Sequence, residues 1–102
     1  MAYDLYGENG YFGINNATMR YMVQAMHEAT QWDYERLLNK FQDHSGRYVN
    51  TAGCRTLYKL ANAARGEESN PDMLPIWDKF ILFLQGECQE DDFGNGGSFT
   101  VS

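Results

Sequence analysis

One stretch near the N-terminus decides the fold class: residues 3–14 read YDLYGENGYFGI. Residues 3–6 alternate apolar and polar side chains, which is typical of a strand with one buried face. Residues 7–10, Gly-Glu-Asn-Gly, have turn chemistry, because Asn-Gly tolerates the positive φ that a tight hairpin turn requires. Residues 11–14 form a second short strand, so the stretch predicts a β-hairpin.

Helical spacing dominates the chain after the hairpin. Apolar side chains recur at i, i+3, i+4 and i+7 in four segments, and this spacing places them on one face of a helix. The positions are Met19, Met22, Val23 and Met26; Tyr34, Leu37, Leu38 and Phe41; Cys54, Leu57, Tyr58, Leu60, Ala61 and Ala64; and Ile76, Trp77, Phe80, Ile81 and Leu84. The methionines favour core filling over an adaptable binding groove.

The helix boundaries are read from capping residues. Asn15 or Asn16 can cap the first helix by accepting a backbone N–H. Thr30 begins a weak capping box that restarts the helix, and whether residues 17–42 form one bent helix or two stays open. Gly66 is placed where a left-handed residue ends a helix, and Pro75 suits the first turn of the next.

The fold class predicted is α+β. Residues 47–49 and 98–101 are strand candidates, and the acidic, glycine-rich stretch near 87–97 is expected to be a mobile loop. We predict one domain over 1–102, with a small, mainly antiparallel sheet. The sheet consists of the N-terminal hairpin, the short middle strand and the C-terminal strand, packed against three or four helices.

Composition excludes several classes of protein. The 102 residues fit one domain, and 43% hydrophobic residues are enough for a core. No apolar run approaches the ~18–20 residues of a membrane span, and we see no basic and apolar leader, so no membrane association and a soluble cytoplasmic protein are expected. The net charge of −6 argues against direct coating of nucleic acid.

Motifs for catalysis or metal binding fail on spacing. The soft metal ligands His27, His44, Cys54 and Cys88 form no Cys-x-x-Cys or His-x-x-x-His pair, so we expect no metal and no cofactor. The cysteines are expected to be reduced thiols, with Cys54 as a small buried hydrophobe. No nucleophile motif is present, so no catalytic residue is assigned; an enzyme that uses Cys54 or Cys88 stays open.

Charge is distributed unevenly along the chain. Residues 1–65 have a net charge of +1, residues 66–102 a net charge of −7, and residues 36–65 a net charge of +5. Arg36 and Lys40 lie four residues apart on one helical face, as do Arg55 and Lys59. The basic middle can pair with the acidic C-terminal part within the fold, or it can bind an anion.

Two binding functions are consistent with this distribution. The first is a non-enzymatic binding protein, an accessory or inhibitor protein that acts on a larger nucleic-acid-handling or defence complex through an acidic surface. The alternative is sequestration of a nucleotide or another small anion by the basic 47–65 region. The acidic surface comprises Glu87, Glu90, Asp91 and Asp92, and the anion site comprises Arg47, Tyr48, Thr51, Arg55, Tyr58 and Lys59.

Several short motifs resemble a family of small bacterial and phage proteins without an assigned activity. The opening Tyr-Asp-Leu-Tyr-Gly of residues 3–7 and the Gly-Tyr-Phe of residues 10–12 are similar to the family's start. Residues 46–49, Gly-Arg-Tyr-Val, and the closing 96–99, Gly-Gly-Ser-Phe, also look similar, whereas residues 13–16 depart from a more aromatic continuation. The resemblance implies the α+β layout and a bacterial or phage origin, and it implies no activity.

Overall fold

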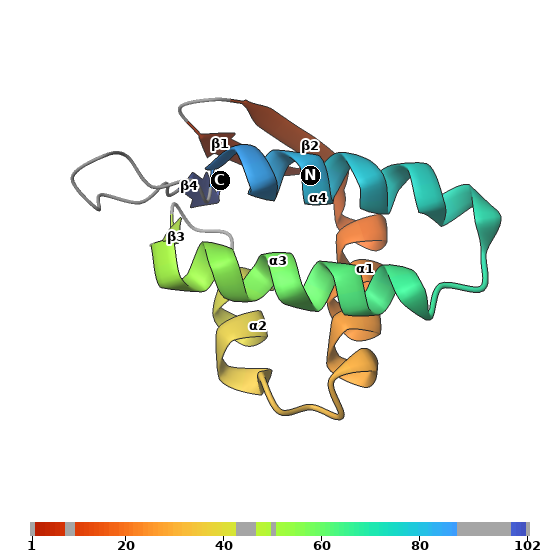
Figure 1. Cartoon of the computed structure of the whole chain (residues 1–102). Helices are drawn as coiled ribbons and strands as arrows, with labels where there is room; N and C mark the ends of the chain where they lie inside the picture. The colour runs from red at the N-terminus through yellow and green to blue at the C-terminus, as the bar shows by residue number, and fades with distance from the viewer. Residues whose placement is uncertain (1, 8–9, 43–46, 50, 88–98, 102) are drawn as a thin grey trace.

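The computed structural model describes residues 2–7, 10–42, 47–49, 51–87 and 99–101, and these form strands and helices in the order of Figure 1. Strands β1 (Ala2–Gly7) and β2 (Tyr11–Asn15) are followed by helices α1 (Asn16–Ala29) and α2 (Glu35–Gln42). Strand β3 (Arg47–Val49) leads into helix α3 (Thr51–Gly66). A 3-10 turn (Pro71–Met73), helix α4 (Leu74–Glu87) and strand β4 (Phe99–Val101) complete the described chain.

The N-terminal hairpin supplies two neighbouring strands of the sheet. β1 pairs antiparallel with β2, with Leu5 opposite Phe12 and Tyr6 opposite Tyr11. β1 pairs on its other side with β4, which also pairs with β3, so the strand order is β2-β1-β4-β3. The prediction of an α+β chain with an antiparallel hairpin and three or four helices is therefore confirmed, with four α-helices in the described residues.

α3 and α4 run antiparallel beside each other, with the hairpin along α4 and α1 crossing α3 (Figure 1). Burial follows the predicted apolar faces, and the methionines of α1 are core residues: Met19, Met22 and Met26 are each 0% exposed. Trp77 and Phe80 of α4 are also fully buried. Burying side chains of this size contributes about 1.5–3 kcal/mol each, so α4 is central to the core as predicted.

Residues 17–42 form two helices rather than one. Asn15 caps α1 as predicted, since its side chain accepts the Thr18 N–H at 2.8 Å. Thr30 does not restart a helix: its hydroxyl donates to the Met26 carbonyl at 2.7 Å, and the residue caps the end of α1. Gln31 and Trp32 then adopt φ of 54° and 63°, a left-handed conformation that interrupts the helical path.

Two further boundary expectations are corrected. Gly66 ends α3 but lies in the helix itself and not in the left-handed region, so no left-handed cap is present there. Glu87 does not belong to a mobile loop, because it is the last residue of α4. The rest of that predicted loop, residues 88–97, lies outside the described residues, as does Asn50.

Candidate functional site

The predicted anion site is only partly described. Arg55 and Lys59 are exposed on α3 and Tyr58 is half-buried, while Arg47 and Tyr48 belong to β3 and Thr51 begins α3. The side chains of the last three residues lie outside the described part of the structure. The structure therefore places Arg55 and Lys59 one helical turn apart on an exposed face, as the i, i+4 spacing predicts.

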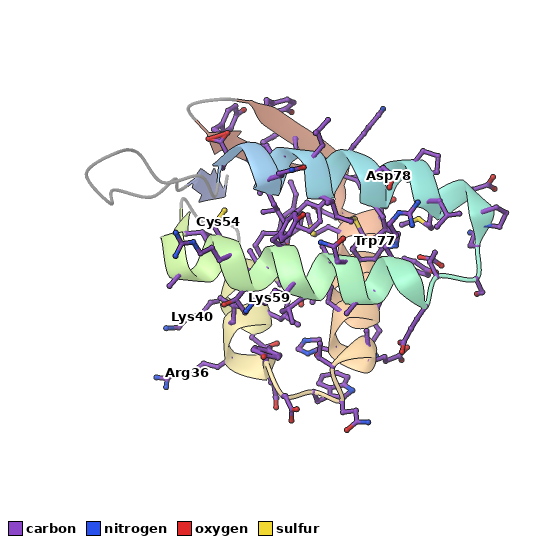
Figure 2. The ribbon with its side chains drawn as sticks, in the orientation of Figure 1. Arg36, Lys40, Cys54, Lys59, Trp77 and Asp78 are labelled. Atoms are coloured by element: carbon purple, nitrogen blue, oxygen red, sulfur yellow. The ribbon has the colours of Figure 1, made fainter. Side chains whose placement is uncertain are left out.

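Two further exposed cations lie on α2. Arg36 and Lys40 are exposed on α2 and extend to the same side of that helix (Figure 2). Lys59 is exposed on α3. Among the described residues, these three side chains form no ion pair. By contrast, Arg65 at the end of α3 pairs with Asp78 of α4 at 2.6 Å. Among the described residues, one basic residue of the middle region, Arg65, thus pairs with the acidic C-terminal part.

The predicted acidic surface needs a correction at Glu87. This side chain is only 2% exposed, so it does not belong to a surface that a partner could contact. It is buried because the last turn of α4 packs against β1, where a methyl group on Gly7 would overlap the Glu87 carboxyl group. Glu90, Asp91 and Asp92 lie outside the described residues.

A different acidic site lies where α1 meets the end of α3, and we call it the acidic notch. It is a hollow of about 190 Å³ whose charged lining residues are Glu28 of α1 and Glu67 and Glu68, which come directly after α3. Lysine and arginine are absent from its lining. Its remaining lining residues are Tyr21, Gln24, Ala25, Ala64 and Ser69. Clustered carboxylates in a hollow concentrate negative potential, so the notch favours a cation.

Glu68 is held in place by three donors. The Trp77 indole N–H donates to Oε1 at 2.7 Å, and the Tyr21 hydroxyl donates to Oε2 at 2.5 Å. The Asn70 N–H also donates to Oε2, at 3.2 Å. Partial burial pushes the pKa of Glu68 up, but these hydrogen bonds outweigh burial and lower the pKa below its usual 4.5. The same hydrogen bond from Tyr21 raises the pKa of the phenol.

Sequence reasoning does not identify the acidic notch. The Glu67-Glu68 pair is visible in the sequence, but there it reads as part of a polar loop. Glu28 and Tyr21 lie some forty residues earlier in the chain, and only the packing of α1 against α3 brings them to the same hollow. The charge pattern of a single segment contains no signal for this pairing.

The cysteine and histidine candidates for catalysis or metal binding are only partly described. Cys54 is fully buried and disulfide-bonded, which contradicts the expected reduced thiol and removes it as a nucleophile. Its Sγ lies 3.8 Å from the carbonyl oxygen of Leu84. Cys88 and His44 lie outside the described residues. Within the described ranges, no three His, Cys, Asp or Glu side chains are arranged to hold a metal ion.

His27 is the described histidine, and it has a structural environment. It is 3% exposed, and its ring stacks on the Trp32 indole with centroids 4.0 Å apart and planes 10° apart. No hydrogen-bond partner is present for Nδ1 among the described residues. The stack packs Trp32 against the last turn of α1.

No protein-family model, curated protein or solved structure matches this chain. The resemblance to small bacterial and phage proteins therefore stays a prediction. In the described residues, no helix combines the length and apolar character that crossing a bilayer requires.

Proposed function

We propose that this protein is a non-enzymatic binding protein that recognises a basic surface of a larger partner protein and acts on it as an accessory or inhibitor. The observation that carries this is the acidic notch, in which three carboxylates line one hollow without a cation among its lining residues. We also propose that residues 1–102 form a single domain. Its mainly antiparallel sheet is built from the hairpin, the middle strand and the C-terminal strand.

The carboxylates of the notch have different roles. Glu68 is oriented by Trp77 and Tyr21, so its charge is fixed in place before a partner arrives. Glu28 and Glu67 are exposed and can move toward an incoming Arg or Lys side chain. Preorganised charge reduces the side-chain ordering that binding requires. Long-range attraction of a basic partner also raises the association rate.

The Tyr21 ring extends the notch as an aromatic wall. It is 43% exposed, and its hydroxyl is already engaged by Glu68. An aromatic face next to carboxylates suits a guanidinium group, which stacks on rings and bonds carboxylates in a planar fork. Arginine is therefore the preferred partner residue.

Neutralising the two exposed carboxylates tests the site. The probe is a fluorescein-labelled peptide of alternating Arg and Ala, titrated against the full chain at low and at high salt. We expect E28Q/E67Q to raise the Kd about three- to tenfold at low salt and to reduce the salt dependence. E90Q/D91N/D92N in the same assay measures how far the C-terminal acids contribute.

The matched control is D33N/E35Q, which removes the same charge from two exposed positions: Asp33, between α1 and α2, and Glu35, the first residue of α2. If this control weakens binding as much as E28Q/E67Q, the peptide responds to total charge and the notch is not the site. Equal binding by wild type and E28Q/E67Q would reject the proposal directly.

A second candidate function is the binding of a small anion. The observation that favours it is the exposure of Arg36 and Lys40 on α2 and of Lys59 on α3, which form no ion pair among the described residues. ATP, GTP and pyrophosphate in a thermal-shift assay test it, because a ligand at 100 times its Kd stabilises the fold by about 2.7 kcal/mol. K40A/K59A should abolish the shift and K79A should retain it; no shift with any of the three anions would reject this function.

A further inference from the structure

A second hollow runs between strand β2 and helix α4, on a different part of the molecule from the acidic notch. We call it the β2–α4 groove. It has a volume of about 450 Å³, which lies within the range of clefts that bind ligands. Residues 10–13 form its strand side, and Lys79, Leu82, Phe83 and Gly86 form its helix side. Figure 1 shows the hairpin extended along α4.

The strand side of the groove is an open edge of the sheet. β2 stands at the end of the strand order and pairs only with β1 among the described strands. The Gly7 N–H donates to the Gly10 carbonyl at 3.0 Å, so these two residues form a hydrogen-bonded pair. Hydrogen-bonded and non-bonded pairs alternate along an antiparallel ladder. The N–H and C=O groups of Tyr11 and Gly13 therefore point away from β1, toward the open edge.

The side chains of β2 leave this edge accessible. Phe12 points into the core, with its ring 5.3 Å from Phe80 and 6.4 Å from Phe83 between centroids. Tyr11 is held on the sheet surface, since its hydroxyl donates to the Asp4 carboxylate and its ring lies 5.2 Å from that of Tyr6. Gly13 has no side chain. A chain that approaches from outside can thus reach the backbone groups of Tyr11 and Gly13.

The helix side supplies an apolar contact and a charge. Leu82 is 68% exposed, the most exposed of the large apolar side chains that the structure describes. Lys79 is exposed and forms no ion pair within the described chain. Glu87 also lines the groove, but it is buried and already has a partner. The groove therefore presents one positive charge beside an apolar wall.

We propose that the β2–α4 groove binds an extended peptide segment of a partner protein, which adds a strand to the open edge of β2. The peptide main chain pairs with Tyr11 and Gly13, one apolar side chain packs against Leu82, and an acidic side chain meets Lys79. Main-chain hydrogen bonds supply affinity in this mode of recognition, and alternate side chains supply specificity.

The positive charge of Lys79 favours an acidic partner segment over a second copy of this chain. A symmetric pairing of two β2 strands would place residues 11–15, YFGIN, beside each Lys79, and this strand has no acidic residue. An acidic partner segment supplies the charge that a second β2 lacks.

Selection from a random linear-peptide library against the full-length protein tests the proposal. We expect enriched peptides that combine an acidic residue with β-branched or aromatic residues. K79E and L82D should each weaken the selected peptides at least about tenfold. The matched control R20E makes the same charge change on α1, outside the lining of the groove, and should leave the affinity within about twofold.

Main-chain pairing is tested on the best selected peptide. Two versions of this peptide are made: one is N-methylated at the odd-numbered residues and the other at the even-numbered residues. In one of the two, the methyl groups face β2 and block the main-chain hydrogen bonds, so the affinity of that version should fall at least about tenfold. Full binding by both versions, or equal loss with K79E and R20E, would overturn the proposal, as would a library without enrichment. Sedimentation of the protein alone should show a monomer; a dimer that L82D dissociates would assign the groove to a second copy instead.

Discussion

Replacing Glu68 by alanine should remove the acceptor that a buried indole depends on. Trp77 is 0% exposed, and its N–H donates to Glu68 at 2.7 Å. A hydrogen bond to a charged acceptor contributes about 1.5–3 kcal/mol, and a buried donor left without a partner costs about 1–3 kcal/mol. The bond from Tyr21 is exposed and adds less. We expect Glu68→Ala to lower the free energy of unfolding by about 2–3 kcal/mol.

Urea unfolding followed by far-ultraviolet circular dichroism measures this loss. The midpoint should fall while the denaturant slope stays constant, since the surface exposed on unfolding is unchanged. In a thermal scan the same loss lowers the Tm by roughly 10–20 °C for a domain of this size. The matched control is Glu67→Ala, the adjacent exposed carboxylate, which should change stability by less than about 0.5 kcal/mol.

The pH dependence supplies an independent test of the same contact. Because the pKa of Glu68 is lowered in the folded state, its ionised form stabilises the fold. That stabilisation is present above the ordinary carboxyl pKa of 4.5 and is lost as the pH falls through the lowered value. The stability difference between wild type and Glu68→Gln should therefore shrink on acidification. Equal losses for Glu68→Ala and Glu67→Ala at neutral pH would refute the reasoning.

Three further predictions concern local structure. Asn15→Ala should cost about 1 kcal/mol through loss of the α1 cap, whereas Asn39→Ala, on the exposed face of α2, should be neutral or slightly stabilising in the same urea titration. Gln31→Gly should stabilise the protein by up to about 1 kcal/mol, because φ is 54° there and glycine adopts this conformation without strain. Gln24→Gly, inside α1, should destabilise the protein by about the same amount, and the opposite order of the two urea midpoints would contradict this reasoning. Reduction with dithiothreitol should lower stability by about 2–4 kcal/mol, and Cys54→Ser should abolish this response to the reductant.

Local patterns predicted the elements well where one physical cause dominated. The apolar stripe of α4 and the alternation of the hairpin both became buried faces, because periodicity directly reports which side of an element avoids water. The break between α1 and α2 was undecidable from spacing. It depends on Thr30 bonding backward to Met26 and on the left-handed backbone of Gln31 and Trp32.

The predictions for individual polar residues were less accurate, because the exposure of a side chain depends on residues that are distant in the sequence. Glu87 is as acidic in sequence as its neighbours, yet α4 carries it against β1 and buries it. Cys54 is buried as its place on a helix face predicts, but it is disulfide-bonded and not the reduced thiol that the sequence led us to expect. In each case the deciding neighbour belongs to another part of the chain.

The amino-acid sequence by itself determined the α+β class, the hairpin, the apolar helix faces and the division of charge between a basic middle and an acidic C-terminal part. These properties depend on residues within one or two turns of each other, where backbone geometry sets the spacing. Only the tertiary structure decided which charges share a surface. Glu68 meets Tyr21 across 47 residues, and the open edge of β2 lies beside Lys79 and Leu82 of α4. Hydrophobic burial drives the elements together without regard to the polar side chains on their other faces, so packing that no single segment encodes decides which polar side chains share a surface.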